Sequence, residues 1–217
     1  GCVISNGVAK EFTENCRSEK GKKRDKFTLV CTGRYSREKR QDILIEAAAL
    51  SKHKDKLKIV FAGDGPLKNK LLSLSEKRGI NAEFGFFTRE ELLKVLRGAD
   101  LYVHTAEIEI EAIACLEAIA GGLVPVIADS SRSATGCYAL TAENLFEYGN
   151  PSALAERIDF WLENPDLAEK NRALYADFTK EIDFDACMDK MEKMILKVAE
   201  NAQKQAVYLQ KAKVGIR

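Results

Sequence analysis

The sequence predicts an α/β protein built on a parallel sheet with helices on both faces. From about residue 27 onward, short runs rich in β-forming residues alternate with helical patterns, which is the arrangement of βαβ units. Several of the expected strands are nearly continuous apolar runs, as strands are when helices cover both faces of a sheet. With 217 residues, the chain is long enough for one well-cored domain and some additional helix, or for two small domains.

The expected elements follow one another regularly along the chain. The strand candidates are FTLVCTG, LKIVFAG, AEFGFF, LYVHTA, VPVIAD and LFEYG. Helices are expected over KRQDILIEAAALSK, from Pro66, from Arg89, from Glu109 and after LFEYG. One long helix is expected from Asp183 to about Lys213, with an apolar stripe of Met188, Met191, Ile195, Val198 and Ala202. Core packing is the default for such a stripe; at a chain end it could instead dock on a part of the protein outside this sequence.

Residues suited to helix starts support this order. Three prolines fit a first helical position, each behind a residue that can cap the helix: Pro66 behind Gly65, Pro151 behind Asn150 and Pro165 behind Asn164. Thr88, with Glu91 three residues later, forms a capping-box pattern.

The charge balance and hydropathy exclude several classes of protein. Lys and Arg number 34 against 33 Asp and Glu, a formal net charge of +1, which argues against a general nucleic-acid-binding protein. No apolar run approaches the length of a membrane-spanning helix. The sequence begins at Gly1 without a start Met or signal peptide, so we expect a piece of a longer protein.

Cysteine and histidine usage points to a reduced, cytoplasmic protein. The six cysteines form no C-x-x-C pair and there are two histidines, a composition that argues against a zinc site and a disulfide framework. The basic stretch RSEKGKKRDK, residues 17–26, is expected to be a solvated loop; a patch for phosphate or lipid headgroups is the alternative.

Cations and glycines follow the expected strands at the edge where open parallel sheets bind ligands. Arg34 and Lys39 come after the first strand, and GDGP, with Gly63 and Gly65, comes after the second. Two cations beside a helix N-terminus would offset most of the charge of a diphosphate, and the two glycines would let the backbone approach a ligand closely. The alternative is that Arg34 and Lys39 are solvated surface charges.

Two acids bracket the stretch EIEAIACLEAIAGGLVPVI, which runs from Glu109 to Ile127. If Glu109 and Glu117 were both helical, about 12 Å of helix axis would separate them, too far to act on one bond as the acid pair of a glycosidase does. The spacing instead suits two hydroxyl-bearing parts of one long ligand with a phosphate group between them. We expect Glu117 to accept from a ribose and Glu109 from a hexose.

This stretch resembles the E-x7-E signature of family-4 retaining glycosyltransferases. Other motifs resemble family motifs in the same order: VISNGV the interdomain hinge, G-R-x-x-x-E-K at 33–39 the phosphate-binding Arg and Lys, G-D-G-P the glycine loop, and FGFFTREEL the base-binding loop. The resemblance extends from Val3 to about residue 180, and five motifs in the right order make it specific.

The resemblance implies the C-terminal, nucleotide-sugar-binding half of a GT-B enzyme, which has two Rossmann-like domains. Its expected divisions are a hinge or linker over 1–26, the Rossmann-like domain over 27–180, and a C-terminal helix over 181–217 that packs on a preceding acceptor domain. Glu109 would face the donor sugar, Arg34 and Lys39 the leaving diphosphate, and Glu117 the ribose. The remaining donor-binding residues would be Gly63, Gly65, Phe86, Ile110, Glu111, Ala112 and Ile113. No metal or cofactor is implied beyond the nucleotide sugar.

The sequence departs from the family at Glu111-Ala112, where the family usually has Phe-Gly. Ala112 in place of glycine could restrict the close approach of a phosphate or sugar to the backbone there. The variant E-I-E-A-I-A-C-L-E, with S-A-T at 133–135, resembles diacylglycerol glucosyltransferases of bacterial membrane glycolipid synthesis. It implies transfer of glucose from UDP-glucose to a lipid at the inner face of the membrane, by an enzyme that is inactive without its acceptor domain. His104, at a strand end, is expected to be structural or catalytic.

Three alternatives remain open. The first is a glycosyltransferase of capsule or lipopolysaccharide synthesis. The second, a nucleotide-sugar 2-epimerase, needs general acid and base residues, and this sequence lacks the histidines and paired acids to supply them. The third, a non-enzymatic α/β module, predicts no affinity for nucleotides.

Overall fold

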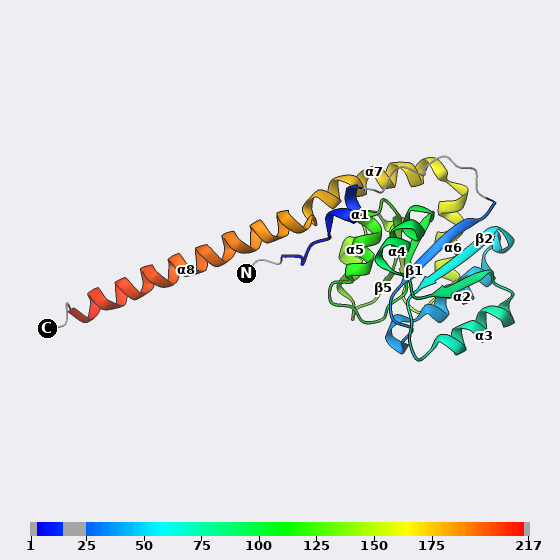
Figure 1. Cartoon of the computed structure of the whole chain (residues 1–217), viewed down its shortest axis with the longest axis horizontal. Helices are drawn as coiled ribbons and strands as arrows, with labels where there is room; N and C mark the ends of the chain where they lie inside the picture. The colour runs from blue at the N-terminus through cyan, green and yellow to red at the C-terminus, as the bar shows by residue number, and fades with distance from the viewer. Residues whose placement is uncertain (1–3, 15–24, 215–217) are drawn as a thin grey trace.

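The fold centres on a parallel sheet of six strands (Figure 1). The computed structural model describes residues 4–14 and 25–214, and side chains within 4–13 and 25–205. The strands are β1 (Phe27–Thr32), β2 (Leu57–Ala62), β3 (Ala82–Gly85), β4 (Leu101–His104), β5 (Val124–Asp129) and β6 (Leu145–Glu147). Their order across the sheet is β3-β2-β1-β4-β5-β6, and every pair is parallel. The α/β prediction is confirmed.

Helices cover both faces of this sheet and bury two separate apolar layers. One face carries α2 (Gln41–Leu50), α3 (Lys68–Arg78) and α6 (Pro151–Glu163). The other carries α1 (Lys10–Glu14), α4 (Arg89–Arg97), α5 (Ile113–Ala120) and most of α7 (Pro165–Glu181), whose Ala168 packs in the first layer. Because both faces are covered, all four residues of β4 and the first five of β5 are buried.

The strand order reverses between β1 and β4. Leu29 of β1 pairs with Leu101 of β4, and Val30 pairs with Tyr102. The chain runs outward from β1 through β2 to β3, then returns to the other side of β1 with β4. Loops after β1 and β4 therefore leave the same edge of the sheet side by side, the position at which doubly wound folds bind ligands.

The N-terminal residues pack against the domain. Val8 and Phe12 are each 1% exposed and belong to the apolar layer of α4, α5 and α7. Val8 also forms a parallel bridge with Asp183, and its backbone N–H donates to the carbonyl of Ile182 at 2.7 Å. The basic stretch 17–26 falls almost entirely outside the described residues.

Most of the expected helix starts are confirmed. Pro151 and Pro165 are at first helical positions, and the Asn150 side chain accepts from the N–H groups of Ser152 and Ala153. Thr88 and Glu91 form the expected capping box.

Two of these expectations are wrong. The helix expected from Pro66 begins at Lys68, because Pro66 lies in a turn that closes when Lys68 N–H donates to the Gly65 carbonyl. Asn164 does not cap α7 with its side chain. Its amide instead donates to the Phe160 carbonyl at the end of α6.

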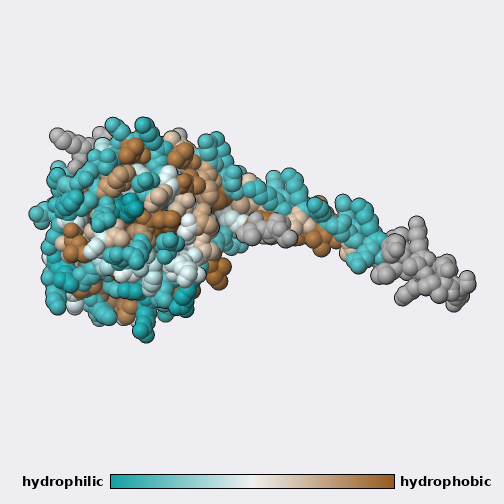
Figure 2. Space-filling model, turned by 180° about the vertical axis from the view of Figure 1, so that it is seen from behind, coloured by the Kyte–Doolittle hydropathy of each residue, from teal (hydrophilic) through white to brown (hydrophobic). Residues whose placement is uncertain are grey.

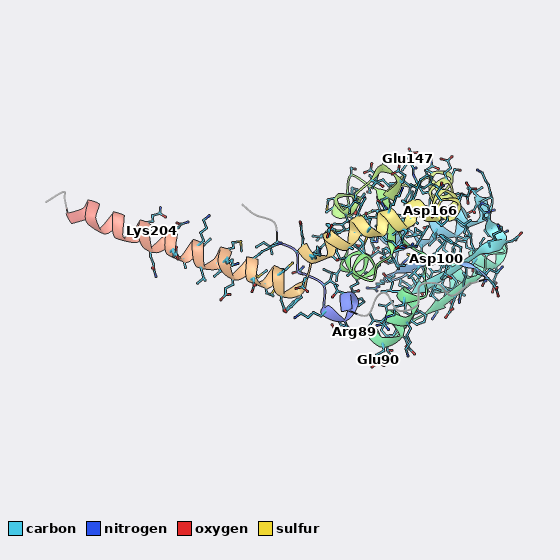
Figure 3. All side chains as sticks on the ribbon, turned by 90° about the horizontal axis from the view of Figure 1, so that it is seen from above. Arg89, Glu90, Asp100, Glu147, Asp166 and Lys204 are labelled. Carbon is cyan, nitrogen blue, oxygen red and sulfur yellow. The ribbon has the colours of Figure 1, made fainter. Side chains whose placement is uncertain are left out.

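The long C-terminal helix α8 (Phe184–Val214) extends away from the globular body (Figure 1). Lys204 lies far out along it (Figure 3). The prediction that its apolar stripe packs in the core is wrong for the outer part of the helix, since Ile195 is 57% exposed and Val198 is 63% exposed. Apolar residues are visible on the surface of this helix (Figure 2). Among the described helices, none is both long and apolar enough to cross a membrane.

Candidate functional site

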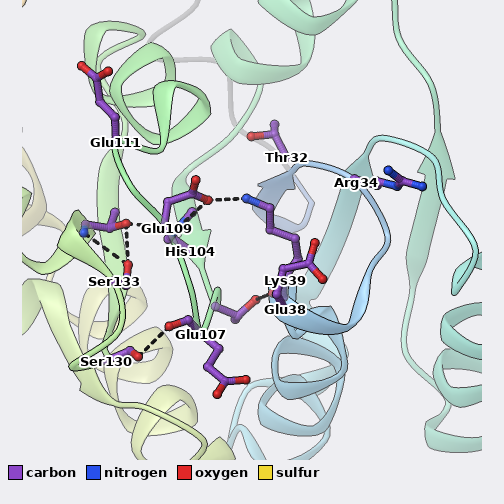
Figure 4. A network of polar contacts seen from close by, with 12 residues as sticks. Thr32, Arg34, Glu38, Lys39, His104, Glu107, Glu109, Glu111, Ser130 and Ser133 are labelled. Carbon is purple, nitrogen blue, oxygen red and sulfur yellow. Dashed lines mark hydrogen bonds and ion pairs between the residues drawn. The ribbon is translucent and has the colours of Figure 1, made fainter. Parts of the chain in front are cut away.

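An ion pair joins the loops after β1 and β4 (Figure 4). The Lys39 ammonium contacts the Glu109 carboxylate, and both side chains are largely shielded from solvent. Lys39 ends a short 3-10 helix, Arg37–Lys39, that follows β1. The sequence suggested both residues as ligand-binding groups, and the strand reversal brings them together.

Glu109 is not helical, contrary to the sequence interpretation, since α5 begins four residues later at Ile113. Glu109 instead pairs with Ser133 in an isolated parallel bridge, and its carbonyl accepts from the Ala134 N–H at 3.0 Å. The helical spacing of about 12 Å assumed for Glu109 and Glu117 therefore does not apply. The extended backbone of Glu109 directs its side chain back toward Lys39 (Figure 4).

Backbone contacts hold the two loops in register around this pair. The Thr105 hydroxyl donates to the Lys39 carbonyl at 2.7 Å, and the Glu107 N–H donates to the Glu38 carbonyl at 2.7 Å. The Ser130 hydroxyl donates to the Glu107 carbonyl at 2.7 Å, which joins the loop after β5. Because Thr105 directly follows the strand LYVH, its position in the sequence could have identified it as a candidate site residue. Nothing in the sequence indicates that its hydroxyl contacts the Lys39 carbonyl.

His104 is a buried neighbour of the pair. Its Nε2 lies 3.9 Å from Glu109 Oε2 and 3.5 Å from Thr135 Oγ1, and the residue is 4% exposed. Burial lowers the pKa of His104 from its ordinary 6.5 to about 4, against an upward effect of Glu109 and with a smaller downward effect of Lys39. His104 is therefore neutral at pH 7 and packs beside the Glu109 carboxylate without adding a charge.

Arg34 is exposed and points away from Lys39 (Figure 4). Its backbone carbonyl accepts from the Gln41 amide at 2.9 Å, which fixes the loop and leaves the guanidinium extended. The two cations thus leave the same loop in different directions, with Lys39 engaged by Glu109 and Arg34 turned outward.

The glycines of GDGP pack closely against the loop after β1. A Cβ on Gly63 would lie 2.0 Å from the Gly33 carbonyl oxygen, and one on Gly65 would lie 2.6 Å from the Tyr35 carbonyl oxygen. The Tyr35 N–H donates to the Asp64 carbonyl at 2.9 Å. These glycines therefore join two loops of the candidate site through backbone contacts, a structural requirement that the sequence interpretation did not foresee.

Glu117 and Phe86 come from different elements, Glu117 from α5 and Phe86 from the loop after β3. Glu117 is half-buried within α5, and burial raises the pKa of its carboxyl above the usual range, with Arg89 acting in the opposite direction. Phe86, after β3, is 81% exposed. Burial of the Glu117 carboxyl costs it hydration, and the exposed Phe86 ring leaves apolar surface in water. Both features are typical of ligand-binding positions.

The segment Ile110–Ile113 turns the chain into α5. Ile110 is 89% exposed, and Ala112 has left-handed backbone angles, φ 52° and ψ 58°. The first helical N–H groups, those of Ile113 and Ala114, donate to no other described residue. Such groups at a helix start can bind an anion.

The side chain of Glu111 points away from the Lys39–Glu109 pair (Figure 4). Its carboxylate accepts from the Ser5 hydroxyl at 2.5 Å, from the Asn6 N–H at 2.8 Å and from the Asn6 side-chain amide. The sequence placed Glu111 among the donor-binding residues but gave no signal for these partners.

Comparison with known proteins yields a family match and close relatives. The sequence profile described as Glycosyl transferases group 1 matches residues 12–176. The catalytic domain of cholesterol-alpha-glucosyltransferase from Helicobacter pylori is 48% identical, with a TM-score of 0.69, over 70% of this chain and 96% of that one. Alpha-monoglucosyldiacylglycerol synthase of Streptococcus pneumoniae is 26% identical over 166 residues, 75% of this chain and 37% of the relative.

A more distant structure shows the shared fold. Anabaena HepE in complex with UDP-glucose has a TM-score of 0.69 at 18% identity, over 80% of this chain and 49% of that one. The putative glycosyltransferase EpsD of Bacillus subtilis is 32% identical over 161 residues, 72% of this chain. The chain spans 42% of the length of that relative and 37% of the length of the Streptococcus pneumoniae relative.

Proposed function

The chain belongs to the family of group 1 glycosyl transferases and has the fold of a GT-B C-terminal domain, and on this basis we propose that it binds UDP-glucose for transfer of glucose to a lipid hydroxyl. The observation that carries the proposal is the Lys39–Glu109 ion pair at the strand reversal, beside the start of α5. Charged groups placed there match the two ends of a sugar diphosphate, a cation for the phosphates and an acid for the sugar hydroxyls.

In the proposed complex, Lys39 and Arg34 stabilise the negative charge that develops on the diphosphate as the bond to the sugar breaks. The first N–H groups of α5 add donors for the same oxygens. Glu109 accepts from the sugar hydroxyls, Glu117 from the ribose, and Phe86 stacks on the base. Gly63 and Gly65 keep the loop after β2 close to the loop after β1.

Donor binding exchanges partners at Lys39. The Lys39 ammonium is paired with Glu109, so it becomes available to a phosphate only when that contact loosens. A sugar diphosphate offers compensation to both groups, phosphate oxygens to Lys39 and hydroxyl donors to Glu109. UDP alone compensates only Lys39, which gives the site a means of distinguishing the donor from the product.

The proposed acceptor follows from the names of the relatives. At 48% identity the Helicobacter pylori relative bears the name of a cholesterol glucosyltransferase, and the Streptococcus pneumoniae relative that of a diacylglycerol glycolipid synthase. Both names describe glucose attached to a lipid. We extend this to the present chain as an expectation for the whole protein, which would add an acceptor domain and work at the inner face of the membrane; residues 181–217 would pack on that domain.

Isothermal titration of the chain with UDP and UDP-glucose tests the proposal. Wild type should bind both ligands, and Lys39→Ala and Glu117→Ala should each weaken UDP binding roughly tenfold to a hundredfold, the effect of losing a hydrogen bond to a charged group. A ligand at about a hundred times its Kd should stabilise the fold by roughly 2.7 kcal/mol.

Matched variants control for loss of charge alone. Lys58→Ala removes a lysine paired with Glu83 at 2.8 Å, and Glu76→Ala removes an exposed acid of α3. Both should bind UDP as wild type does. A folded wild-type chain that binds neither ligand, or controls that lose affinity as much as Lys39→Ala, would contradict the proposal.

A further inference from the structure

Glu111 connects two parts of the chain that lie 106 residues apart. One carboxylate oxygen accepts from the Ser5 hydroxyl and the Asn6 N–H, and the other accepts from the Asn6 amide. Three donors on one ionised carboxylate make a stronger contact than neutral hydrogen bonds do. The segment Ser5–Gly7 is therefore held to the loop that precedes α5.

The same residue is fixed from a second side. The Glu111 carbonyl accepts from the Tyr138 hydroxyl at 2.7 Å, and the Tyr138 carbonyl accepts from the Tyr175 hydroxyl at 2.8 Å. The next residue, Ala112, has a left-handed backbone that is strained for a side chain with a Cβ. Surroundings that fix Glu111 on two sides can maintain this strain and, with it, the direction of the first N–H groups of α5.

We infer that Glu111 is a positioning residue that couples donor binding to the segment Ser5–Gly7. This inference rests on the proposed function, since it takes the α5 start to be where the diphosphate binds. The ligand and the segment contact opposite ends of a single turn, Ile110–Ile113. A ligand that favours the observed turn therefore also favours the contact of Glu111 with Ser5 and Asn6. By reciprocity, loss of that contact lowers the affinity for the ligand by the same factor by which the ligand strengthens the contact.

Hydrogen exchange of residues 4–8 and UDP titration test the coupling in the full chain. In Glu111→Gln without ligand, exchange across 4–8 should be at least about tenfold faster, because the Asn6 N–H loses a charged acceptor. UDP at saturation should slow exchange of 4–8 in wild type but not in Glu111→Gln. The UDP Kd of Glu111→Gln should rise about fivefold to tenfold, at the lower end of typical coupling between sites.

Variants on the other side of the contact separate coupling from a local packing defect. Ser5→Ala removes one hydrogen-bond donor to Glu111 at a distance from the proposed diphosphate, and it should raise the UDP Kd as Glu111→Gln does. Ser5→Thr keeps the hydroxyl and should have the wild-type Kd. Glu107→Gln changes an acid of the same loop that pairs with Arg132 at 2.7 Å, and residues 4–8 should keep wild-type exchange in it.

The outcomes separate this inference from the proposed function. Wild-type exchange of 4–8 in ligand-free Glu111→Gln would overturn the inference whether or not UDP binds. Faster exchange with an unchanged UDP Kd would also overturn it, because the contact would then be structural only. A wild-type chain that binds no UDP would overturn the proposed function, and the coupling with it, while the ligand-free exchange would still report on the contact.

Discussion

Gly7 and Phe184 pack so closely that a Cβ on Gly7 would lie 2.7 Å from the Phe184 Cα. Gly7 also has φ +77°, in the left-handed region that favours glycine. The segment that reaches Glu111 therefore crosses the start of α8 at a point where a side chain has no room. Backbone hydrogen bonds between Val8 and both Ile182 and Phe184 continue the contact.

Substitution of Gly7→Ala should detach this segment. Gly149 provides the matched control, because it has φ +78° and no atom within 4 Å of a built Cβ. Gly149→Ala should cost only the left-handed backbone, about 1 kcal/mol, and Gly7→Ala should cost about 1–3 kcal/mol more through overpacking. Denaturant unfolding measures both, and exchange of the Val8 N–H shows whether the loss is local. Equal costs would mean that the segment shifts without penalty.

Ala112→Gly should stabilise the protein or leave it unchanged. Glycine adopts φ 52° without strain, which offsets its greater freedom in the unfolded chain. The expected change in unfolding free energy is between zero and about +1 kcal/mol. Ala173→Gly, in the exposed middle of α7, should instead lose about 1 kcal/mol. Similar losses in the two variants would show that the turn is not strained.

His104 should make stability depend on pH between about 6.5 and about 4. Its pKa is lowered by burial, so the unfolded chain binds a proton in this window that the folded chain does not. Stability is therefore fully present above the unfolded pKa and falls as the pH drops toward 4, by up to about 3 kcal/mol. Urea unfolding at several pH values measures the slope.

His104→Gln should flatten that slope, since glutamine does not titrate. His53→Gln is the control, because His53 is only partly buried and contacts Glu163 at 2.8 Å on another part of the surface. A wild-type slope retained in His104→Gln would assign the pH dependence to other groups.

The sequence was sufficient for the fold and for most of the charged groups, because these follow from local patterns. Lys39 and Glu109 could be named since each follows a strand, and parallel strands end at one edge of the sheet. The start of α5 could not be placed, because Ala112 is a strong helix former by type and its left-handed angles depend on contacts from elsewhere. The partners of Glu111 lie 106 residues away and leave no local pattern.

Glu117→Gln should stabilise the ligand-free fold while weakening nucleotide binding. Burial raises the pKa of Glu117, so the folded state disfavours its ionised form and the carboxylate opposes folding at neutral pH. Removing the charge should raise Tm at pH 7, less so at pH 4, where the group is more protonated. UDP affinity should fall in parallel if Glu117 accepts from the ribose. A variant that is less stable at pH 7 would contradict this account, and Glu76→Gln should change neither quantity.

Glu109→Gln should separate affinity for UDP from affinity for UDP-glucose. Because Glu109 pairs with Lys39, the neutral amide of the variant leaves the ammonium available to the diphosphate. UDP should therefore bind as tightly as in wild type or a few times more tightly, by roughly the effect of one ion pair in a partly exposed site. UDP-glucose should lose any advantage over UDP, since the sugar no longer meets a carboxylate. Titration of both ligands into wild type and variant measures this difference. Weaker binding of UDP itself to Glu109→Gln would show that Glu109 orients Lys39 toward the phosphates rather than competing with them.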